Sequence, residues 1–332
     1  MDIISDLKQR ARATNGTIVL PESGDTRMLE AAQLIVSEKI AKVILLGNPT
    51  QIQSDAQRLG VDLSGVTFID PENYSGIGEF SQFFYNKRKE KGVTQEDADK
   101  IVRQPLFFGA LLVKFGLASG MVAGAANTTA DVLRAALQVV GVKAGLKTVS
   151  STFIMVLPDF MGEEKVMLFA DCAVVPLPDA SQLADIAMST AETRRAILGD
   201  EPMVAMLSFS TKGSAEHELV TKVRDAMEIM KQRGTDFVFD GEMQLDAAIV
   251  PKVGASKAPG SPVAGQANVL IFPDLQSGNI GYKIAQRIGK AEAIGPIIQG
   301  LAAPVCDLSR GCSTQDIVGT AVLVLLMASN NK

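Results

Sequence analysis

Short apolar runs rich in β-branched residues alternate along this chain with longer segments of helical periodicity. The runs occupy residues 17–20, 43–46, 66–69, 121–123, 153–156, 166–170 and 203–209, with weaker candidates at 269–272 and 294–298. Between them, residues 130–139 and 216–232 carry apolar side chains at spacings of three and four. Runs that are apolar on both faces suit parallel strands covered by helices. The pattern therefore predicts an α/β fold.

The length of the chain, 332 residues, indicates more than one hydrophobic core. Single cores usually stop growing at about 250–300 residues, so two domains are expected. No Gly/Ser-rich or Pro-rich linker marks a boundary, and the segment at 141–147 (GVKAGLK) is the most plausible crossover. Residues 254–265 (GASKAPGSPVAG) offer little that could pack and are predicted to form an exposed loop.

Charge and cysteine content exclude several classes of protein. The chain has 32 Lys and Arg against 37 Asp and Glu, a net charge of −5, whereas nucleic acids and membrane surfaces are bound by clustered cations. Three cysteines without CxxC spacing and a single histidine, His217, argue against structural zinc and a disulfide framework. The N-terminus lacks an apolar signal-peptide core. We therefore expect a cytoplasmic protein that binds neither nucleic acid nor membrane, and holds no metal.

The apolar run at 317–328 is too short to span a bilayer, which takes about 20 residues, and is predicted to be a buried helix. The densest polar signal lies just before it, in DLSRGCSTQD at 307–316. Ser313 and Asp316 have the spacing of a capping box, so a helix is predicted to begin here. Its free N–H groups would face a loop where Ser309 and Arg310 add a hydroxyl and a guanidinium, which favours a site for a phosphate or phosphate ester. In the alternative, which the pattern alone favours, Asp316 is only a capping acid and Arg310 forms a surface ion pair.

A similar arrangement follows the run at 121–123, where NTTAD at 127–131 precedes a helix that bears Arg134. Ligands of open α/β sheets bind beyond the carboxyl ends of strands, which makes Asn127 and Thr129 candidate binding residues. The alternative is a capping box between Thr128 and Asp131, with Arg134 solvated.

Two further segments carry weaker signals. The segment PDLQSGNIGYK at 273–283 leads from a strand into a helix with Lys283 one turn in, but GxGxxG is absent and a nicotinamide site of the Rossmann type is rejected. Residues 87–91 (KRKEK), which include Arg88, are expected to be a solvated helix face, or else to meet the phosphates of a large anion.

Four long stretches match a known family. They are LSFSTKGSAEH (207–217), FDGEMQLDAA (239–248), SPVAGQANVLIFPDLQSGNIGYK (261–283) and GPIIQGLAAPVCDLSRGCSTQDIV (295–318). On these motifs the chain resembles the phosphotransacetylase (phosphate acetyltransferase) family from near its start to its end. The resemblance implies a two-domain α/β protein of the isocitrate/isopropylmalate dehydrogenase type with an interdomain active-site cleft. It assigns residues 1–145 and 307–332 to the first domain and 146–306 to the second, and it implies a homodimer.

The same resemblance implies reversible acetyl transfer between coenzyme A and inorganic phosphate. Coenzyme A (or acetyl-CoA) and acetyl phosphate (or phosphate) are then substrates, and no cofactor is expected. Ser309, Arg310 and Asp316 match the catalytic cluster of the family, while Arg88 and Arg134 match arginines associated with the substrates. Together with Asn127, Thr129 and Lys283, these two arginines form the predicted substrate-binding set.

In the implied mechanism Asp316 takes the proton of the coenzyme A thiol, Arg310 grips the phosphate and Ser309 donates a hydrogen bond to developing charge. An ordinary aspartate facing an ordinary thiol leaves a pKa gap of about 4.6 units, which is about 6 kcal/mol of uphill proton transfer. We therefore expect Arg310 to stabilise the thiolate as well as the phosphate.

Some positions depart from the pattern expected of the family. Glu216 and Glu218 flank His217 where Lys and Pro are expected, and Cys306 stands where Asn is expected. The flanking acids weaken a substrate-contacting role for the His217 loop. Two other functions stay open: transfer of a longer acyl chain such as propionyl or butyryl, because a methylene group is worth only about 1–3 kcal/mol in a pocket, and a catalytically silent ligand-sensing domain on the same scaffold.

Overall fold

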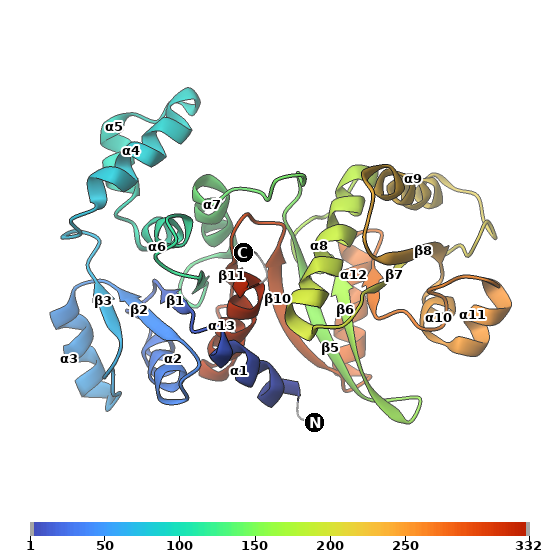
Figure 1. Ribbon diagram of the computed structural model, residues 1–332, viewed down its shortest axis with the longest axis horizontal. Coiled ribbons are helices and arrows are strands. Elements are labelled where there is room, and N and C mark those ends of the chain that lie inside the picture. Colours follow the sequence, from blue (N-terminus) through green and yellow to red (C-terminus); the bar gives the residue numbers. More distant parts are fainter. Residues whose placement is uncertain (1–2, 330–332) are drawn as a thin grey trace. The chain divides into compact units, whose positions relative to one another are not determined.

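The computed structural model describes residues 3–329 and divides into two compact α/β units (Figure 1). The first comprises Met1–Gly141 and Leu301–Lys332, and the second comprises Val142–Gly300. The chain thus enters the second unit once and returns to complete the first. The predicted two-domain α/β class is confirmed.

The first unit has a five-stranded sheet in the order β11-β4-β1-β2-β3, and every pairing within it is parallel. Its strands are β1 (Thr17–Leu20), β2 (Lys42–Leu46), β3 (Thr67–Ile69), β4 (Gly120–Ala123) and β11 (Val305–Asp307). Its helices are α1 (Ile3–Ala13), α2 (Thr26–Ser37), α3 (Pro49–Leu59), α4 (Ile77–Arg88), α5 (Gln95–Ile101), α6 (Pro105–Lys114), α7 (Thr129–Val139) and α13 (Thr314–Ser329), with a short 3₁₀ turn, η1, at Lys89–Lys91. Because parallel strands run in one direction, their carboxyl ends gather at one edge of this sheet.

Helix α13 confirms the prediction of a buried apolar helix near the end of the chain. Eight of its side chains, from Ile317 to Leu326, are buried, and the helix packs against α1, α2 and β4. Gly120 permits this approach, because a Cβ atom there would overlap the side chain of Val324. The last helix therefore covers the sheet that β11 completes.

The second unit has a six-stranded sheet in the order β10-β5-β6-β9-β7-β8. Its strands are β5 (Ser150–Phe160), β6 (Glu163–Ala170), β7 (Met203–Leu207), β8 (Val238–Met243), β9 (Val269–Ile271) and β10 (Glu292–Gln299). Its helices are α8 (Ala180–Leu198), α9 (Glu218–Arg233), α10 (Leu245–Ile249), α11 (Pro251–Lys257) and α12 (Leu275–Arg287). The pairings β10·β5 and β5·β6 are antiparallel, which the alternation of strands and helices did not predict, because β5 and β6 are joined by a tight turn instead of a helix.

Three local expectations need comment. Strand β10 forms as predicted across Gly295 and Pro296, with a shift of register between Ile294 and Ile297 that accommodates them. Strands β8 and β11 were missed, since one contains the polar sequence FDGE and the other has three residues. The predicted loop at 254–265 is partly wrong: its first four residues belong to α11, which Pro251 opens at a first-turn position that suits proline.

Candidate active site

Three loops meet beyond the carboxyl ends of three adjacent strands of the first unit. They are residues 21–25 after β1, 124–128 after β4 and 308–313 after β11. The central strands β1 and β4 pair in parallel, and β11 continues the sheet beside β4. The second and third loops contain the polar segments at 127–131 and 307–316 that the sequence singled out. Both segments therefore lie at one edge of one sheet, although the sequence pattern did not predict β11, the strand that places the segment at 307–316 there.

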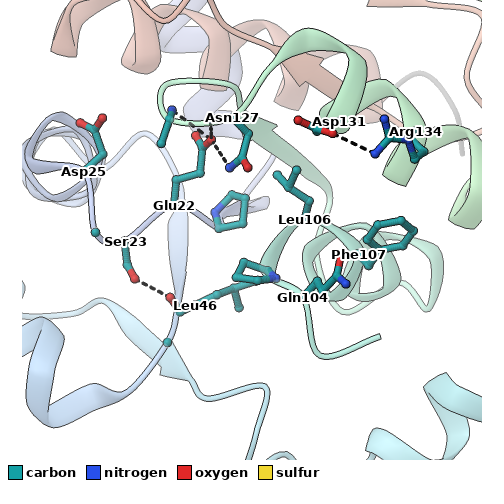
Figure 2. A pocket seen from close by; sticks show the side chains of 15 residues that line it. Glu22, Ser23, Asp25, Leu46, Gln104, Leu106, Phe107, Asn127, Asp131 and Arg134 are labelled. Carbon is teal, nitrogen blue, oxygen red and sulfur yellow. Dashed lines mark hydrogen bonds and ion pairs between the residues drawn. The ribbon is translucent and has the colours of Figure 1, made fainter. Parts of the chain in front are cut away.

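A buried carboxylate, Glu22, joins the first loop to the second (Figure 2). Its two oxygens accept hydrogen bonds from the backbone N–H groups of Gly124, Ala125, Ala126 and Asn127, at 2.8–3.1 Å. The side-chain amide of Asn127 donates a fifth, at 2.7 Å. Consecutive N–H groups of this kind would otherwise suit a phosphate. Here an internal anion occupies them, so a bound phosphate has to find other donors.

A guanidinium, that of Arg27, ties all three loops together. Its Nη1 donates to the backbone oxygens of Arg310 (2.9 Å) and Cys312 (2.8 Å), and its Nη2 donates to that of Ala125 (2.8 Å). The carboxylate of Asp25 accepts hydrogen bonds from Nε at 3.0 Å and from Nη2 at 2.7 Å, and Asp25 also caps the start of α2. These bonds to Arg27 hold the pKa of Asp25 below its usual value. The loop that carries Arg310 is thus held by its backbone, which leaves the Arg310 side chain free to turn outward.

Asp307, the last residue of β11, is the most perturbed acid of this edge. Its side chain is buried, and its Oδ2 accepts a hydrogen bond of 2.6 Å from the hydroxyl of Thr129 at the start of α7. Its Oδ1 is buried without a partner among the described residues. Burial raises the pKa of Asp307 to about 6. The hydrogen bonds from Thr129 and from the backbone N–H of Leu308 oppose this rise, whereas the nearby charge of Glu22 adds to it.

The three predicted catalytic residues lie on or just after the third loop, and all three are exposed. Ser309 accepts a bond of 3.2 Å from the N–H of Gly311 through its hydroxyl oxygen. Asp316 and Ser313 form the predicted capping box: Asp316 Oδ2 accepts from the N–H and hydroxyl of Ser313 at 2.8 and 2.9 Å, and the N–H of Asp316 donates back at 3.2 Å. The surface ion pair considered for Arg310 is not observed between residues 3 and 329, which leaves its guanidinium open to a ligand.

Arg134 lies on α7 at the rim of a cavity, together with Asn127 (Figure 2). It forms an ion pair with Asp131 at 2.9 Å, and its side chain is 56% exposed, as in the alternative of a solvated arginine. The predicted bond between Thr128 and the start of α7 is present, since the Thr128 hydroxyl oxygen accepts from the N–H of Asp131 at 3.2 Å. The cavity has a volume of about 770 Å³. Its lining consists of Pro21, Glu22, Ser23, Gly24, Asp25, Leu46, Gly47, Gln104, Pro105, Leu106, Phe107, Ala126, Asn127, Asp131 and Arg134.

Two other predicted binding residues lie on helices α4 and α12, one in each unit. Arg88 ends α4, and its Nε is buried without an acceptor in the described part of the chain. Its neighbour Lys87 donates to the backbone oxygen of Val139 at 2.7 Å, and burial together with the charges of Lys114 and Arg88 lowers the pKa of Lys87. The basic run is therefore more than a solvated helix face. Lys283 is exposed on α12 of the second unit, with its ammonium 5.8 Å from the ring centre of Tyr282.

The His217 loop of the second unit is held by another buried acid, Glu242. The Glu242 carboxylate accepts from the Ser210 hydroxyl and the Gly213 N–H, both at 2.9 Å, and from two guanidinium nitrogens of Arg224. Burial opposes this charge, but the bonds from Arg224, Gly213 and Ser210 lower the pKa of Glu242 to about 2. His217 itself caps α9. The loop is built around a structural ion pair, and neither Glu242 nor Arg224 was singled out from the sequence.

Among residues 3–329, no three His, Cys, Asp or Glu side chains gather in a way that could hold a metal ion. Over the same range, every helix is too short or too polar to cross a membrane.

Nearly the whole chain matches known proteins. A family model described as "Phosphate acetyl/butaryl transferase" matches residues 2–325. A phosphate acetyltransferase of Thermoanaerobacterium thermosaccharolyticum is 52% identical over 329 residues, which cover 99% of this chain and 100% of that protein. The chain belongs to the phosphate acetyl/butaryl transferase family. It is therefore an acyltransferase, and the resemblance carried by the four motifs is confirmed.

Solved structures of phosphotransacetylases agree with this membership. A phosphotransacetylase from Streptococcus pyogenes superimposes with a TM-score of 0.93 at 45% identity, covering 98% of each chain. A branched-chain phosphotransacylase from Enterococcus faecalis matches with a TM-score of 0.66 at 18% identity, covering 94% of this chain and 98% of that one. The second likeness shows a shared fold alone.

Proposed function

We propose that this acyltransferase moves an acetyl group reversibly between acetyl phosphate and coenzyme A. The main support for this proposal comes from the loop at 308–313. Arg27 fixes its backbone, while the side chains of Ser309 and Arg310 stay exposed. The names of the full-length relatives, phosphate acetyltransferase, support acetyl as the group transferred. Since Glu22 already fills the N–H groups of the neighbouring loop, Arg310 is the donor at this edge that suits a phosphate.

The chemistry requires no covalent enzyme intermediate. The thiolate of coenzyme A attacks the carbonyl carbon of acetyl phosphate, and the carbon–oxygen bond to phosphate breaks with its electron pair leaving on phosphate. Asp316 accepts the thiol proton, Arg310 binds the phosphate and Ser309 donates to the oxygen on which charge develops. The capping bonds of Asp316 all use Oδ2. Its Oδ1 makes no hydrogen bond within the described chain and is the atom available to take the proton.

Arg88 and Arg134 are proposed to meet the other phosphates of the substrates. Arg134 is 56% exposed and its partner Asp131 is 39% exposed, so their ion pair is worth only about 0–1 kcal/mol and yields easily to a more highly charged anion. The buried Nε of Arg88 has no acceptor among the described residues, which an anionic ligand would supply. Asn127 and Thr129 would complete the wall on this side, and Lys283 on α12 is proposed as a further substrate-binding residue.

The deciding experiment measures thioester formation from coenzyme A with acetyl, propionyl and butyryl phosphate. We expect acetyl phosphate to be the fastest of the three. A higher rate with butyryl phosphate would show a longer-chain acyltransferase, and binding without any thioester would show a silent ligand sensor. Asp316→Asn, Arg310→Gln and Ser309→Ala then test the assignments, and Asp316→Asn with normal turnover at every pH would refute its role as the base.

We also propose that the protein is a homodimer and works in the cytoplasm, where coenzyme A is available. An apolar stripe along α12 and its C-cap residue supports the dimer: Ile280, Ile284 and Ile288 recur at a spacing of four and are 57%, 52% and 77% exposed. Light scattering after chromatography should give twice the chain mass of 35.2 kDa for the wild type. Ile284→Glu should shift the mass toward the single chain, whereas Leu59→Glu on α3, which is also exposed, should not.

A further inference from the structure

The inner end of the site is formed by a buried acid that the reaction just described does not use. Asp307 is 3% exposed. In the parallel pairing of β11 with β4, it lies opposite Ala123. The N–H of Leu308 still donates to the backbone oxygen of Ala123, at 2.8 Å. Asp307 is therefore fixed at the last rung of the sheet, two residues before Ser309.

The carboxyl group of Asp307 touches the other two loops of the site. Its Oδ2 takes the hydrogen bond from Thr129, at 2.6 Å. Its Oδ1 lies against Gly124, where a Cβ atom would overlap it. The N–H of that same Gly124 donates to Glu22 at 2.9 Å. Two carboxyl groups thus lie on either side of one backbone segment in a buried environment.

The two acids differ in how many donors they receive. Glu22 accepts five hydrogen bonds, which suit a carboxylate. Asp307 accepts one side-chain bond and leaves one oxygen without a partner in the described chain, and within that part of the chain it forms no ion pair. Glu22 is the titratable group that faces it, and Thr129 is the polar side chain that faces it from α7. A proton arriving here is therefore better placed on Asp307, in keeping with its pKa of about 6.

The charge of Asp307 controls what Thr129 can offer to a ligand. A hydroxyl has one proton and two lone pairs. While Asp307 is ionised, that proton is committed to Oδ2, and Thr129 can only accept a hydrogen bond from the ligand side. Once Asp307 is protonated, its own O–H can donate to Thr129, and the hydroxyl proton of Thr129 is released to donate outward.

We propose that Asp307 and Thr129 form a positioning pair in which the protonation of Asp307 sets the hydrogen-bond direction of Thr129 at the acyl-transfer site. With Asp307 ionised, Thr129 accepts a hydrogen bond from an amide N–H of the pantetheine arm of coenzyme A and so aligns the substrate, while the thiol proton still goes to Asp316. With Asp307 protonated, Thr129 offers a donor and this alignment is lost. The inference rests on the proposed function, because it takes coenzyme A as the ligand that Thr129 meets.

The kinetic test compares matched variants across pH. Thr129→Ser keeps the hydroxyl and Thr129→Val replaces it with a methyl group, while Asp307→Asn keeps an acceptor that does not titrate. In the wild type and in Thr129→Ser, the rate of acetyl-CoA formation should be about tenfold lower one pH unit below the midpoint near pH 6 than on its plateau. In Thr129→Val and Asp307→Asn this acid limb should disappear, and kcat of Thr129→Val should be reduced on the plateau. A limb that persists in Asp307→Asn, or equal profiles for Thr129→Val and Thr129→Ser, would overturn the proposal.

A spectroscopic test separates the pair from the overall reaction. Infrared difference spectra should show a protonated carboxyl group that titrates in the wild type with a midpoint of about 6, and Asp307→Asn should lack it. Its carbonyl frequency should shift in Thr129→Val and stay in place in Thr129→Ser. Absence of this band in the wild type would refute the pair, whereas its presence in a protein that makes no acetyl-CoA would refute the proposed reaction alone. If Asp307→Asn fails to fold, the two variants at Thr129, an exposed position, still decide the question.

Discussion

Replacing Glu22 by glutamine should strongly destabilise the first unit, although it changes one atom. The carboxylate oxygen Oε1 receives three donors and Oε2 receives the N–H groups of Gly124 and Ala125. In Glu22→Gln the amide oxygen can keep the Oε1 side, but the NH₂ group then faces two buried N–H donors. Each unsatisfied buried donor costs about 1–3 kcal/mol, and the remaining bonds weaken when the acceptor loses its charge. The expected loss is about 3–6 kcal/mol of unfolding free energy.

Urea denaturation followed by circular dichroism measures this loss directly. The matched control is Glu79→Gln, the same change at an exposed position of α4 in the same unit, which should alter stability by less than about 0.5 kcal/mol. If Glu22→Gln were as mild as Glu79→Gln, the view that an internal anion holds the β4–α7 loop would be wrong. Activity should fall together with stability, because Asn127 lies in that loop and Thr129 follows it directly.

Three further outcomes are expected. Arg27→Lys retains the positive charge, but a lysine cannot reach the backbone oxygens of three residues at once, so kcat should fall at least about tenfold. The control is Arg58→Lys, which changes an arginine in an exposed ion pair and should leave kcat near the wild-type value. The pKa of Glu242 is depressed to about 2, so its contribution to folding stability is complete above its usual pKa of 4.5 and is lost as pH falls through about 2. The unfolding free energy measured across this pH range should therefore change by at most about 3 kcal/mol on account of Glu242, and Glu242→Gln should remove this change. Gly124→Ala should cost more than about 2 kcal/mol, because its Cβ would meet the backbone of Leu308 at 2.6–2.7 Å, whereas Gly116→Ala bears the positive-φ cost alone and should be milder in thermal unfolding.

Both units use buried carboxylates to satisfy loops at the ends of strands. In the second unit, Asp171 follows β6 and accepts from the N–H groups of Ala173, Val174 and Val175 at 2.7–3.2 Å. Glu22, which follows β1, plays the same part in the first unit, but it accepts from N–H groups in the loop after a different strand, β4. Such loops carry their own anion, so no bound ligand is needed to satisfy these N–H groups. The phosphate of a substrate is then left to guanidinium groups, in keeping with the role proposed for Arg310 and Arg134.

The amino-acid sequence determined the elements of this protein and the positions of its candidate polar segments. Strand β1 was predicted at its observed bounds, and α13 was predicted as a buried helix that begins with a capping box between Ser313 and Asp316. These features depend on spacings of a few residues, which local patterns contain. The four motifs also indicated the acyltransferase family, which full-length matches confirm.

The tertiary structure alone decided which side chains hold the candidate site together. Glu22 reaches donors 102–105 residues away, and Arg27 reaches carbonyl groups 283 and 285 residues away. Such partners are set by the order of strands in the sheet, in which β11 from the end of the chain lies beside β4. The sequence around an acid after a strand does not show whether that acid faces solvent or five hydrogen-bond donors. Its environment, and with it the unusual pKa of Asp307, exists only once the distant segments have packed.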